Sequence, residues 1–272
     1  GMALAARTSP SDAGLLAAEA LLRATRPTAV NLAWALSEAS RAWRDQPMEQ
    51  RAARLYQLAA DLADADVSAC RAIAEHGAPL LLAHKREGRA LNILTHCNAG
   101  WLATVDWGTA LAPIFELHAR GVPLHVWVDE TRPRNQGLLT AWELTQAGIP
   151  CTLIVDNAGG LLMRRGLVDA CIVGSDRTVR NGDVCNKVGT YLKALAARDC
   201  GLPFYVALPW STVDLSIESG DDIPIEERSG SEVSELPFVT VANPAFDVTP
   251  ARLVTRLITD RGCFTPNELS GL

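Results

Sequence analysis

The sequence predicts an α/β protein in which a helical N-terminal subdomain, residues 1–90, precedes a parallel sheet with helices on both faces, residues 91–272. Two observations support this fold class. Alanine and leucine dominate the first 90 residues at helical spacing, and strand signals are absent there. Beyond residue 90, short apolar runs alternate with amphipathic segments, and strand starts recur about every 20–35 residues, as in βαβ crossovers.

Three helices are expected in the N-terminal subdomain, because apolar residues recur there at helical spacing. A proline ends each of the first two, since the residue before a proline is pushed out of the helical region. Gly77 and Pro79 are expected to close the third. The expected helices are Ser11–Ala24, Leu32–Trp43 and Arg51–Glu75.

Five apolar runs are expected to form a Rossmann-like parallel sheet, with one helix in each gap. The expected strands are 91–94, 123–128, 151–155, 170–173 and 203–208. The helices expected between them are 108–119, 138–147, 159–165 and 186–197. A last strand is expected at 239–241, and a closing helix at 249–258, begun by Pro250 in its first turn. The polar segment 221–231 has the composition of a solvated loop.

The composition restricts the partners. A net charge of −6 argues against nucleic-acid and membrane-surface binding, because both need clustered positive charge. No apolar run of about 18 residues predicts a membrane span. The seven cysteines are odd in number and contain no Cys-x-x-Cys pair, which argues against a disulfide framework and a zinc site. We therefore expect a cytoplasmic protein with a small-molecule partner.

Polar residues gather at the predicted carboxyl ends of the strands, where open parallel sheets bind ligands. Cys97 follows the first strand, and backbone amides or a cation in its loop are expected to lower the thiol pKa. Asp176 follows a fully apolar strand, where desolvation would raise its pKa and suit it to donate a proton. Each residue also has an ordinary structural interpretation, as a buried inert thiol and a turn-capping carboxylate.

Cations near these loops predict an anion site. Lys187, with Asn186 beside it, is expected in the first turn of a helix, where free amides attract phosphate. Arg132 and Arg134 could form either surface ion pairs or a bidentate grip on a phosphate. His96 is expected to make structural hydrogen bonds, and neither a metal nor an organic cofactor is expected. The sequence contains no dinucleotide fingerprint, phosphate-binding P-loop or serine nucleophile elbow.

Specific segments at these loops resemble one enzyme family. They include RPTAVNLAWAL, LTHCNAG, DETRPRNQG, LTAWELTQAGIP, VDNAGGLLMRRG, VGSDRTVRNGDVCNKVGTY, DLSIESGDDIPIEER and VANPAFDVTP, and they run from Arg26 to the C-terminus. The sequence resembles the methylthioribose-1-phosphate isomerase family, which shares its fold with ribose-1,5-bisphosphate isomerase and with regulatory subunits of translation initiation factor 2B. Enzymes of this family usually carry an N-terminal Arg-Gly-Ala-Pro motif as well, and this sequence contains none.

The resemblance implies the roles of the site residues. Cys97 and Asp176 match the family's catalytic cysteine and aspartate. The residues implied to bind substrate are Arg26, Gln136, Asn186 and Lys187, and Asp247 is a further candidate for contact with sugar hydroxyls. The implied reaction converts S-methyl-5-thioribose 1-phosphate to S-methyl-5-thioribulose 1-phosphate, an aldose–ketose step of methionine salvage. It needs no cofactor, and the family is typically homodimeric.

Other functions remain open at this point. The chain could be a non-catalytic sugar-phosphate-binding protein, or a regulatory or assembly protein like the initiation factor 2B subunits. It could also isomerise 5-deoxyribose 1-phosphate or ribose 1,5-bisphosphate. Regulatory subunits generally lack the cysteine–aspartate pair, so the presence of Cys97 and Asp176 favours an enzyme.

Overall fold

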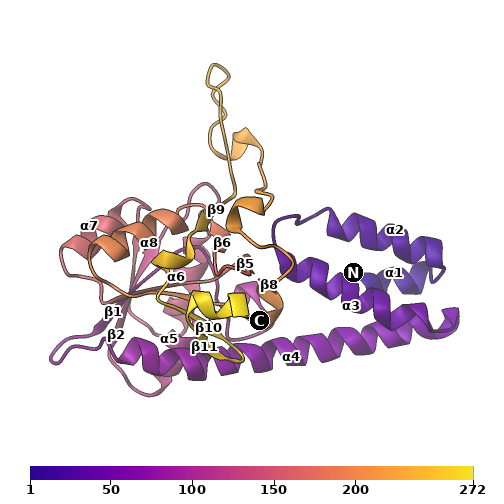
Figure 1. Cartoon of the computed structure of the whole chain (residues 1–272), viewed down its shortest axis with the longest axis horizontal. Helices are drawn as coiled ribbons and strands as arrows, with labels where there is room; N and C mark the ends of the chain where they lie inside the picture. Colours follow the sequence, from indigo (N-terminus) through magenta and orange to yellow (C-terminus); the bar gives the residue numbers. More distant parts are fainter. Residues whose placement is uncertain (272) are drawn as a thin grey trace.

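The computed structural model describes residues 1–271 and consists of a helical N-terminal part beside an α/β part (Figure 1). The N-terminal helices are α1 (Met2–Thr8), α2 (Asp12–Arg23), α3 (Val30–Arg44) and α4 (Met48–Leu82). Their shared core surrounds the fully buried Trp43, and the Arg51 guanidinium lies 4.7 Å from the centre of its ring. No helix in the described part of the chain is long and apolar enough to cross a bilayer.

Helix α4 runs through Gly77 and Pro79, so the expectation that these residues close it is wrong. Gly77 faces helix α5, because a Cβ there would lie 2.5 Å from Pro113. Ala78 and Leu81, in the last turn, are fully buried against the sheet. Their burial offsets the backbone hydrogen bond that Pro79 cannot donate. Tertiary packing therefore extends the helix beyond its local stop signals.

The main sheet has seven strands in the order β11-β10-β7-β4-β1-β2-β3. All of its strand pairs are parallel except β10–β11. The five predicted strands are confirmed as β1 (Leu91–Thr95), β2 (Leu124–Asp129), β3 (Cys151–Ile154), β4 (Ala170–Val173) and β7 (Phe204–Ala207). The last two strands are β10 (Arg256–Thr259) and β11 (Gly262–Phe264). This order is that of a doubly wound, Rossmann-like sheet.

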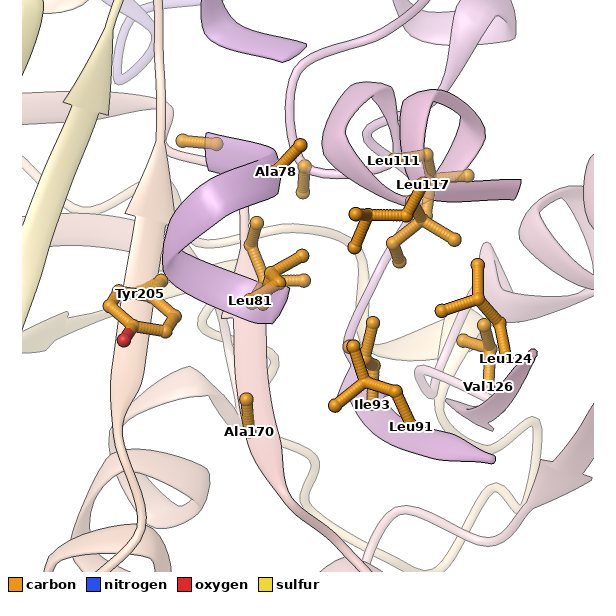
Figure 2. Packing of buried hydrophobic residues seen from close by; sticks show 14 of the residues in the cluster. Ala78, Leu81, Leu91, Ile93, Leu111, Leu117, Leu124, Val126, Ala170 and Tyr205 are labelled. Atoms are coloured by element: carbon orange, nitrogen blue, oxygen red, sulfur yellow. The ribbon is translucent and has the colours of Figure 1, made fainter. Parts of the chain in front are cut away.

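Helices cover both faces of this sheet, which confirms the predicted fold class. Helix α4 and the crossover helices α5 (Ala112–Ala119) and α6 (Gly137–Gln146) contribute to the core on one face. Figure 2 shows part of that core, in which Leu81 of α4 and Leu117 of α5 lie over Ile93 of β1. Helices α7 (Ala158–Arg164) and α8 (Thr190–Asp199) contribute to the core on the other face.

A second, four-stranded sheet in the order β8-β5-β6-β9 was not predicted. It contains β5 (Arg177–Val179), β6 (Val184–Lys187), β8 (Val213–Asp214) and β9 (Phe246–Thr249). The helix expected from residue 186 begins only at Thr190, so Asn186 and Lys187 lie in strand β6 and not in a helical turn. Pairing of β6 with β9 places Asn186 opposite Asp247 and Lys187 opposite Phe246.

The C-terminal expectations are also wrong. Residues 239–241 form no strand, and residues 249–258 form no α-helix. Pro250 precedes only a single 3₁₀ turn, Ala251–Leu253, because Leu257 and Ile258 pair with β7 and are fully buried in the main sheet. The segment 221–231 is only partly a solvated loop, since Ile223 packs into a small core with Phe246.

Helix α4 contacts α1 at one end of its length and α5 and β10 at the other. This one helix therefore belongs to the cores of both parts of the chain. The division into two domains at residue 90 stays a prediction.

Candidate active site

The site lies at the centre of the main sheet, where β1 pairs with β4. The chain continues from β1 toward one edge of the sheet and from β4 toward the other, so this pair is the topological switch point. Ligands of doubly wound sheets bind beyond the strand ends at such a point. Cys97 follows β1 and Asp176 follows β4. Both side chains line one cavity of about 540 Å³. This volume lies within the range typical of small-molecule sites.

The cavity brings together most of the residues predicted from the sequence. Besides Cys97 and Asp176, the predicted residues that line it are Arg26, Gln136, Asn186 and Lys187. Asp247 does not line it. Its carboxylate accepts hydrogen bonds from the backbone amides of Gly189, at 2.7 Å, and Tyr191, at 3.2 Å. Asp247 therefore holds the turn between β6 and α8, and its contact with sugar hydroxyls stays a prediction.

Cys97 has an unusual backbone conformation, with a φ of +68°. A residue with a Cβ seldom adopts this left-handed region unless its surroundings hold it there. The Cys97 amide donates to Oγ1 of Thr131 at 2.8 Å, and its carbonyl accepts from Oγ1 of Thr140 at 2.8 Å. The two threonines lie in the loop after β2 and in helix α6. The loop after β2 and helix α6 thus fix the backbone that carries the thiol.

The expectation of a lowered Cys97 pKa is wrong. Burial, together with a smaller effect of the nearby Asp176 carboxylate, raises the pKa of the thiol to about 11. The backbone amide of Asn98 and the cations Lys187 and Arg26 act in the opposite direction. A loop position at a strand end suggested free solvent access, but Cys97 is half-buried, and desolvation of the thiolate outweighs these three stabilising groups.

The pKa of Asp176 is raised, as its position after an apolar strand predicts. Burial raises the pKa of its carboxyl, while Arg26, Lys187 and Arg228 lower it. A nitrogen of the Arg26 guanidinium lies 3.4 Å from Oδ1 of Asp176. About a fifth of the Asp176 side chain is exposed, toward the cavity it lines.

Four cationic side chains line the cavity: Arg26, Arg134, Lys187 and Arg228. Lys187 extends from strand β6, and its ammonium lies 4.3 Å from the centre of the Phe246 ring and donates to the carbonyl of Ala245 at 2.7 Å. Burial lowers the Lys187 pKa. Two carboxylates, Asp66 and Asp176, line the same cavity, so the cationic side chains outnumber them. The net positive charge of the lining suits an anionic ligand.

Arg228 was missed by the sequence analysis, although it lies within the DLSIESGDDIPIEER segment. Its Nε donates to Glu226 at 2.6 Å, and this contact leaves the terminal nitrogens of the guanidinium for other partners. Arg134 forms a two-point ion pair with Glu232, and Arg132 donates to the carbonyl of Val233 at 3.2 Å and does not line the cavity. Of the two arginines weighed for a phosphate grip, only Arg134 reaches the cavity.

Gln136 precedes helix α6 and lines the cavity. Its Oε1 is buried and has no hydrogen-bond partner within residues 1–271. Such a group is destabilising unless it is satisfied. A hydroxyl of a bound ligand would satisfy it.

His96, Asp129 and Asp156 are close enough together to hold a metal ion. Their contacts fit a different role. Nδ1 of His96 lies 2.8 Å from Asp129 and Nε2 lies 2.9 Å from the Val188 carbonyl. The Lys193 ammonium lies 3.1 Å from Asp129, and a metal ion there would have to displace it. The cluster is a buried hydrogen-bonded network that ties β1 and β2 to α8, in line with a structural His96.

The chain is similar to known proteins in sequence and in structure. The model of the initiation factor 2 subunit family matches residues 12–266. The chain is 59% identical to the methylthioribose-1-phosphate isomerase of Methylobacterium nodulans over 98% of this chain and 79% of that protein. The crystal structure of 5-methylthioribose 1-phosphate isomerase from Pyrococcus horikoshii OT3 is similar, with a TM-score of 0.84 and 43% identity over 99% of this chain and 79% of that one. Subunit delta of initiation factor eIF-2B from A. fulgidus gives a TM-score of 0.78 and 40% identity, over 100% and 84%.

The buried Asp176 carboxyl makes stability depend on pH. Its pKa in the folded protein lies above the ordinary value of 3.8, so its ionisation opposes folding. This penalty is absent below the ordinary value, grows as pH rises through the folded-state pKa, and is complete above it. Asp176→Asn should therefore increase the free energy of unfolding in urea at about pH 7.5, by an amount that shrinks toward about pH 4.

Asp221→Asn is the control for this measurement, because Asp221 is exposed and lies outside the cavity. It should show no such pH-dependent gain. An Asp176→Asn protein that is less stable than the wild type at neutral pH would contradict the prediction.

Proposed function

The chain belongs to the initiation factor 2 subunit family, and within it to the methylthioribose-1-phosphate isomerases, and we propose that it converts S-methyl-5-thioribose 1-phosphate to S-methyl-5-thioribulose 1-phosphate. This membership confirms the resemblance seen in the sequence. The observation that carries the proposal is that Cys97 and Asp176 line one cavity together with four cations. This isomerisation requires an acid–base group at the ring oxygen, a second group that acts on C1 and C2, and positive charge that binds the phosphate. A carboxyl, a thiol and the cationic side chains can supply these three functions.

Asp176 is proposed as the acid–base group at the sugar ring. The phosphate on C1 blocks the anomeric oxygen, so the ring opens only if a proton reaches the ring oxygen as its bond to C1 breaks. A carboxyl whose pKa is raised by burial holds a proton closer to neutral pH and can donate it. The resulting carboxylate is stabilised by Arg26 and Lys187, because both cations lower the Asp176 pKa.

Cys97 is proposed to act on the carbon framework, where hydrogen moves from C2 to C1. Burial keeps its sulfur protonated at neutral pH in the absence of substrate, so it enters the reaction as a thiol. The Asp176 carboxylate left by ring opening takes the thiol proton, and the Asn98 amide and the two nearby cations stabilise the thiolate that forms. This thiolate takes the proton from C2 and returns it to C1, and the C2 hydroxyl then gives up its proton to restore the thiol as the ketone forms. The thiol and the carboxyl thus act at different atoms of one substrate.

The substrate phosphate is proposed to lie among Arg26, Lys187 and Arg228, which line the cavity. Guanidinium groups suit a phosphate because they donate two parallel hydrogen bonds. Gln136 and Asn186 are proposed to contact the sugar hydroxyls. The seven free thiols support a reducing, cytoplasmic location.

Turnover of the phosphorylated sugar tests the proposal. The wild type should convert methylthioribose 1-phosphate to the ketose, followed by proton NMR. Cys97→Ser and Asp176→Asn should each lower kcat by about 10²–10⁴-fold, the contribution typical of a positioned acid or base. Cys200→Ser is the control and should keep the wild-type rate, because Cys200 is half-buried and does not line the cavity.

Equal rates in the wild type, Cys97→Ser and Asp176→Asn would remove these two catalytic roles. Conversion of 5-deoxyribose 1-phosphate or ribose 1,5-bisphosphate, tested in parallel, would reassign the substrate. A wild type that is thermally stabilised by the sugar phosphate but forms no product would instead be a binding protein.

Arg228 should contribute to binding more than to chemistry, because it is proposed to hold the non-reacting phosphate. Arg228→Gln should raise KM about 10- to 100-fold with little change in kcat, since a hydrogen bond to a charged group contributes about 1.5–3 kcal/mol. Arg164→Gln, in an exposed position of α7, should leave both constants unchanged. A fall in kcat at constant KM would place Arg228 at the reacting atoms instead.

We also propose that the chain forms a homodimer through the β3 edge of the main sheet. Strand β3 ends the sheet, and Leu153 is 42% exposed. Val155, just after β3, is 60% exposed, and Trp142, on the helix α6 that packs against β3, is 52% exposed. Exposed apolar and aromatic residues that lie together are typical of interfaces.

Sedimentation equilibrium tests the dimer. The wild type should sediment at twice the chain mass, and Trp142→Glu should shift it toward the monomer, because a buried unpaired charge opposes association. Leu21→Glu, on the distant helix α2, places the same charge at a 72% exposed leucine and should leave the dimer intact. A monomeric wild type would contradict the proposal.

A further inference from the structure

Glu143 is a buried carboxylate that faces the loop carrying Cys97. It lies on helix α6, and its side chain is fully buried. Oε1 accepts hydrogen bonds from Nδ2 of Asn98 at 2.8 Å and from the Leu102 amide at 3.3 Å, and Oε2 accepts one from the Trp101 amide at 2.8 Å. All three donors are neutral and lie within five residues after Cys97. A buried carboxylate held only by neutral donors is costly, and burial raises its pKa.

Gly100 is adapted to this contact. A Cβ at Gly100 would overlap the Glu143 carboxylate, and every nearest atom belongs to that side chain. The backbone of Gly100 has a φ of −97° and a ψ of −163°, which any residue can adopt. The absence of a side chain at position 100 therefore serves the close approach of Glu143 and not a special backbone conformation.

Asn98 connects Glu143 to the thiol. Its side chain is held by Glu143 and by Thr140. Its backbone amide is the group that interacts with the Cys97 sulfur and favours the thiolate. Thr140 also binds the Cys97 carbonyl. Helix α6 thus fixes Asn98, whose backbone amide favours the Cys97 thiolate. Glu143 itself does not line the cavity.

We propose that Glu143 is a positioning residue for Cys97, which holds the loop 98–102 so that the Asn98 amide supports the thiolate while the sulfur faces Asp176. This inference rests on the proposed catalytic role of Cys97. Glu143 does not touch the substrate, and its effect reaches the reaction through Asn98.

The test compares Glu143→Gln with the wild type in two assays. Glutamine keeps the shape of the side chain but has one oxygen, so its NH₂ group must face a backbone N–H or the Asn98 amide. The pH midpoint of Cys97 alkylation by iodoacetamide, followed on the Cys97 peptide by mass spectrometry, should rise. With the sugar phosphate, kcat should fall by about 10²-fold, as for a small misplacement of a reacting group, with KM within threefold of the wild type.

Gly100→Ala is a second variant that disturbs the same contact from the other side. It should show the same two effects, and the double variant should be no worse than either single one, because both remove one interaction. This variant also keeps the test decisive if Glu143→Gln fails to fold. Glu116→Gln is the matched control, because Glu116 lies on helix α5 in a surface pair with Arg120, 2.7 Å away. It should leave both assays unchanged.

An alkylation midpoint and a kcat that stay at wild-type values in Glu143→Gln or Gly100→Ala would overturn the inference. So would a loss of thermal stability with an unchanged alkylation profile, which is the result expected of a purely structural residue. The alkylation assay needs no substrate. A wild type that forms no product would therefore defeat the proposed function, while the alkylation profile would still decide the role of Glu143.

Discussion

The pairing of β1 with β4 at the centre of the sheet is the contact on which the site depends. Its register sets Ile93 beside Ala170 and Leu94 beside Cys171. The chain leaves both strands at the same edge, so the loops that carry Cys97 and Asp176 must meet there. A parallel sheet buried on both faces tolerates no register shift, because every side chain of these strands would change face. The core therefore brings the two loops together, and contacts from other elements then fix Cys97 and Asp176 within them.

Burial shifts the pKa values of the titratable side chains that line this cavity. Desolvation raises the pKa of both Cys97 and Asp176, and it lowers that of Lys187. All three shifts favour the neutral forms of the free site. The arginines that line the cavity keep their charge, because guanidinium cannot be deprotonated in proteins. An anionic substrate then compensates fixed positive charge on binding, and burial raises the proton affinity of both the thiol and the carboxyl.

The central strands were predictable because parallel strands covered on both faces are continuous apolar runs, as in Ala170–Val173. The second sheet was not, since β6 and β9 are four residues long and carry the polar Asn186, Lys187 and Asp247. Residues that serve the site break the pattern by which a strand is recognised. The Cys97 pKa was misjudged for a related reason: desolvation of the thiol by the surrounding fold is a tertiary property that a loop position does not reveal.

The helical part of the chain is a structural component of the site. Arg26 lies between α2 and α3 and reaches Asp176. The carbonyl of Thr28 accepts from Nε of Arg177, and the Val30 amide donates to the carbonyl of Asp176 itself. The helical segment thus binds the backbone of Asp176, the proposed acid–base group, and supplies the cation nearest to its carboxylate. Any movement of α3 relative to the sheet would change the position and the proton affinity of Asp176 together, so the packing of α3 and α4 on the α/β part is a condition for the chemistry.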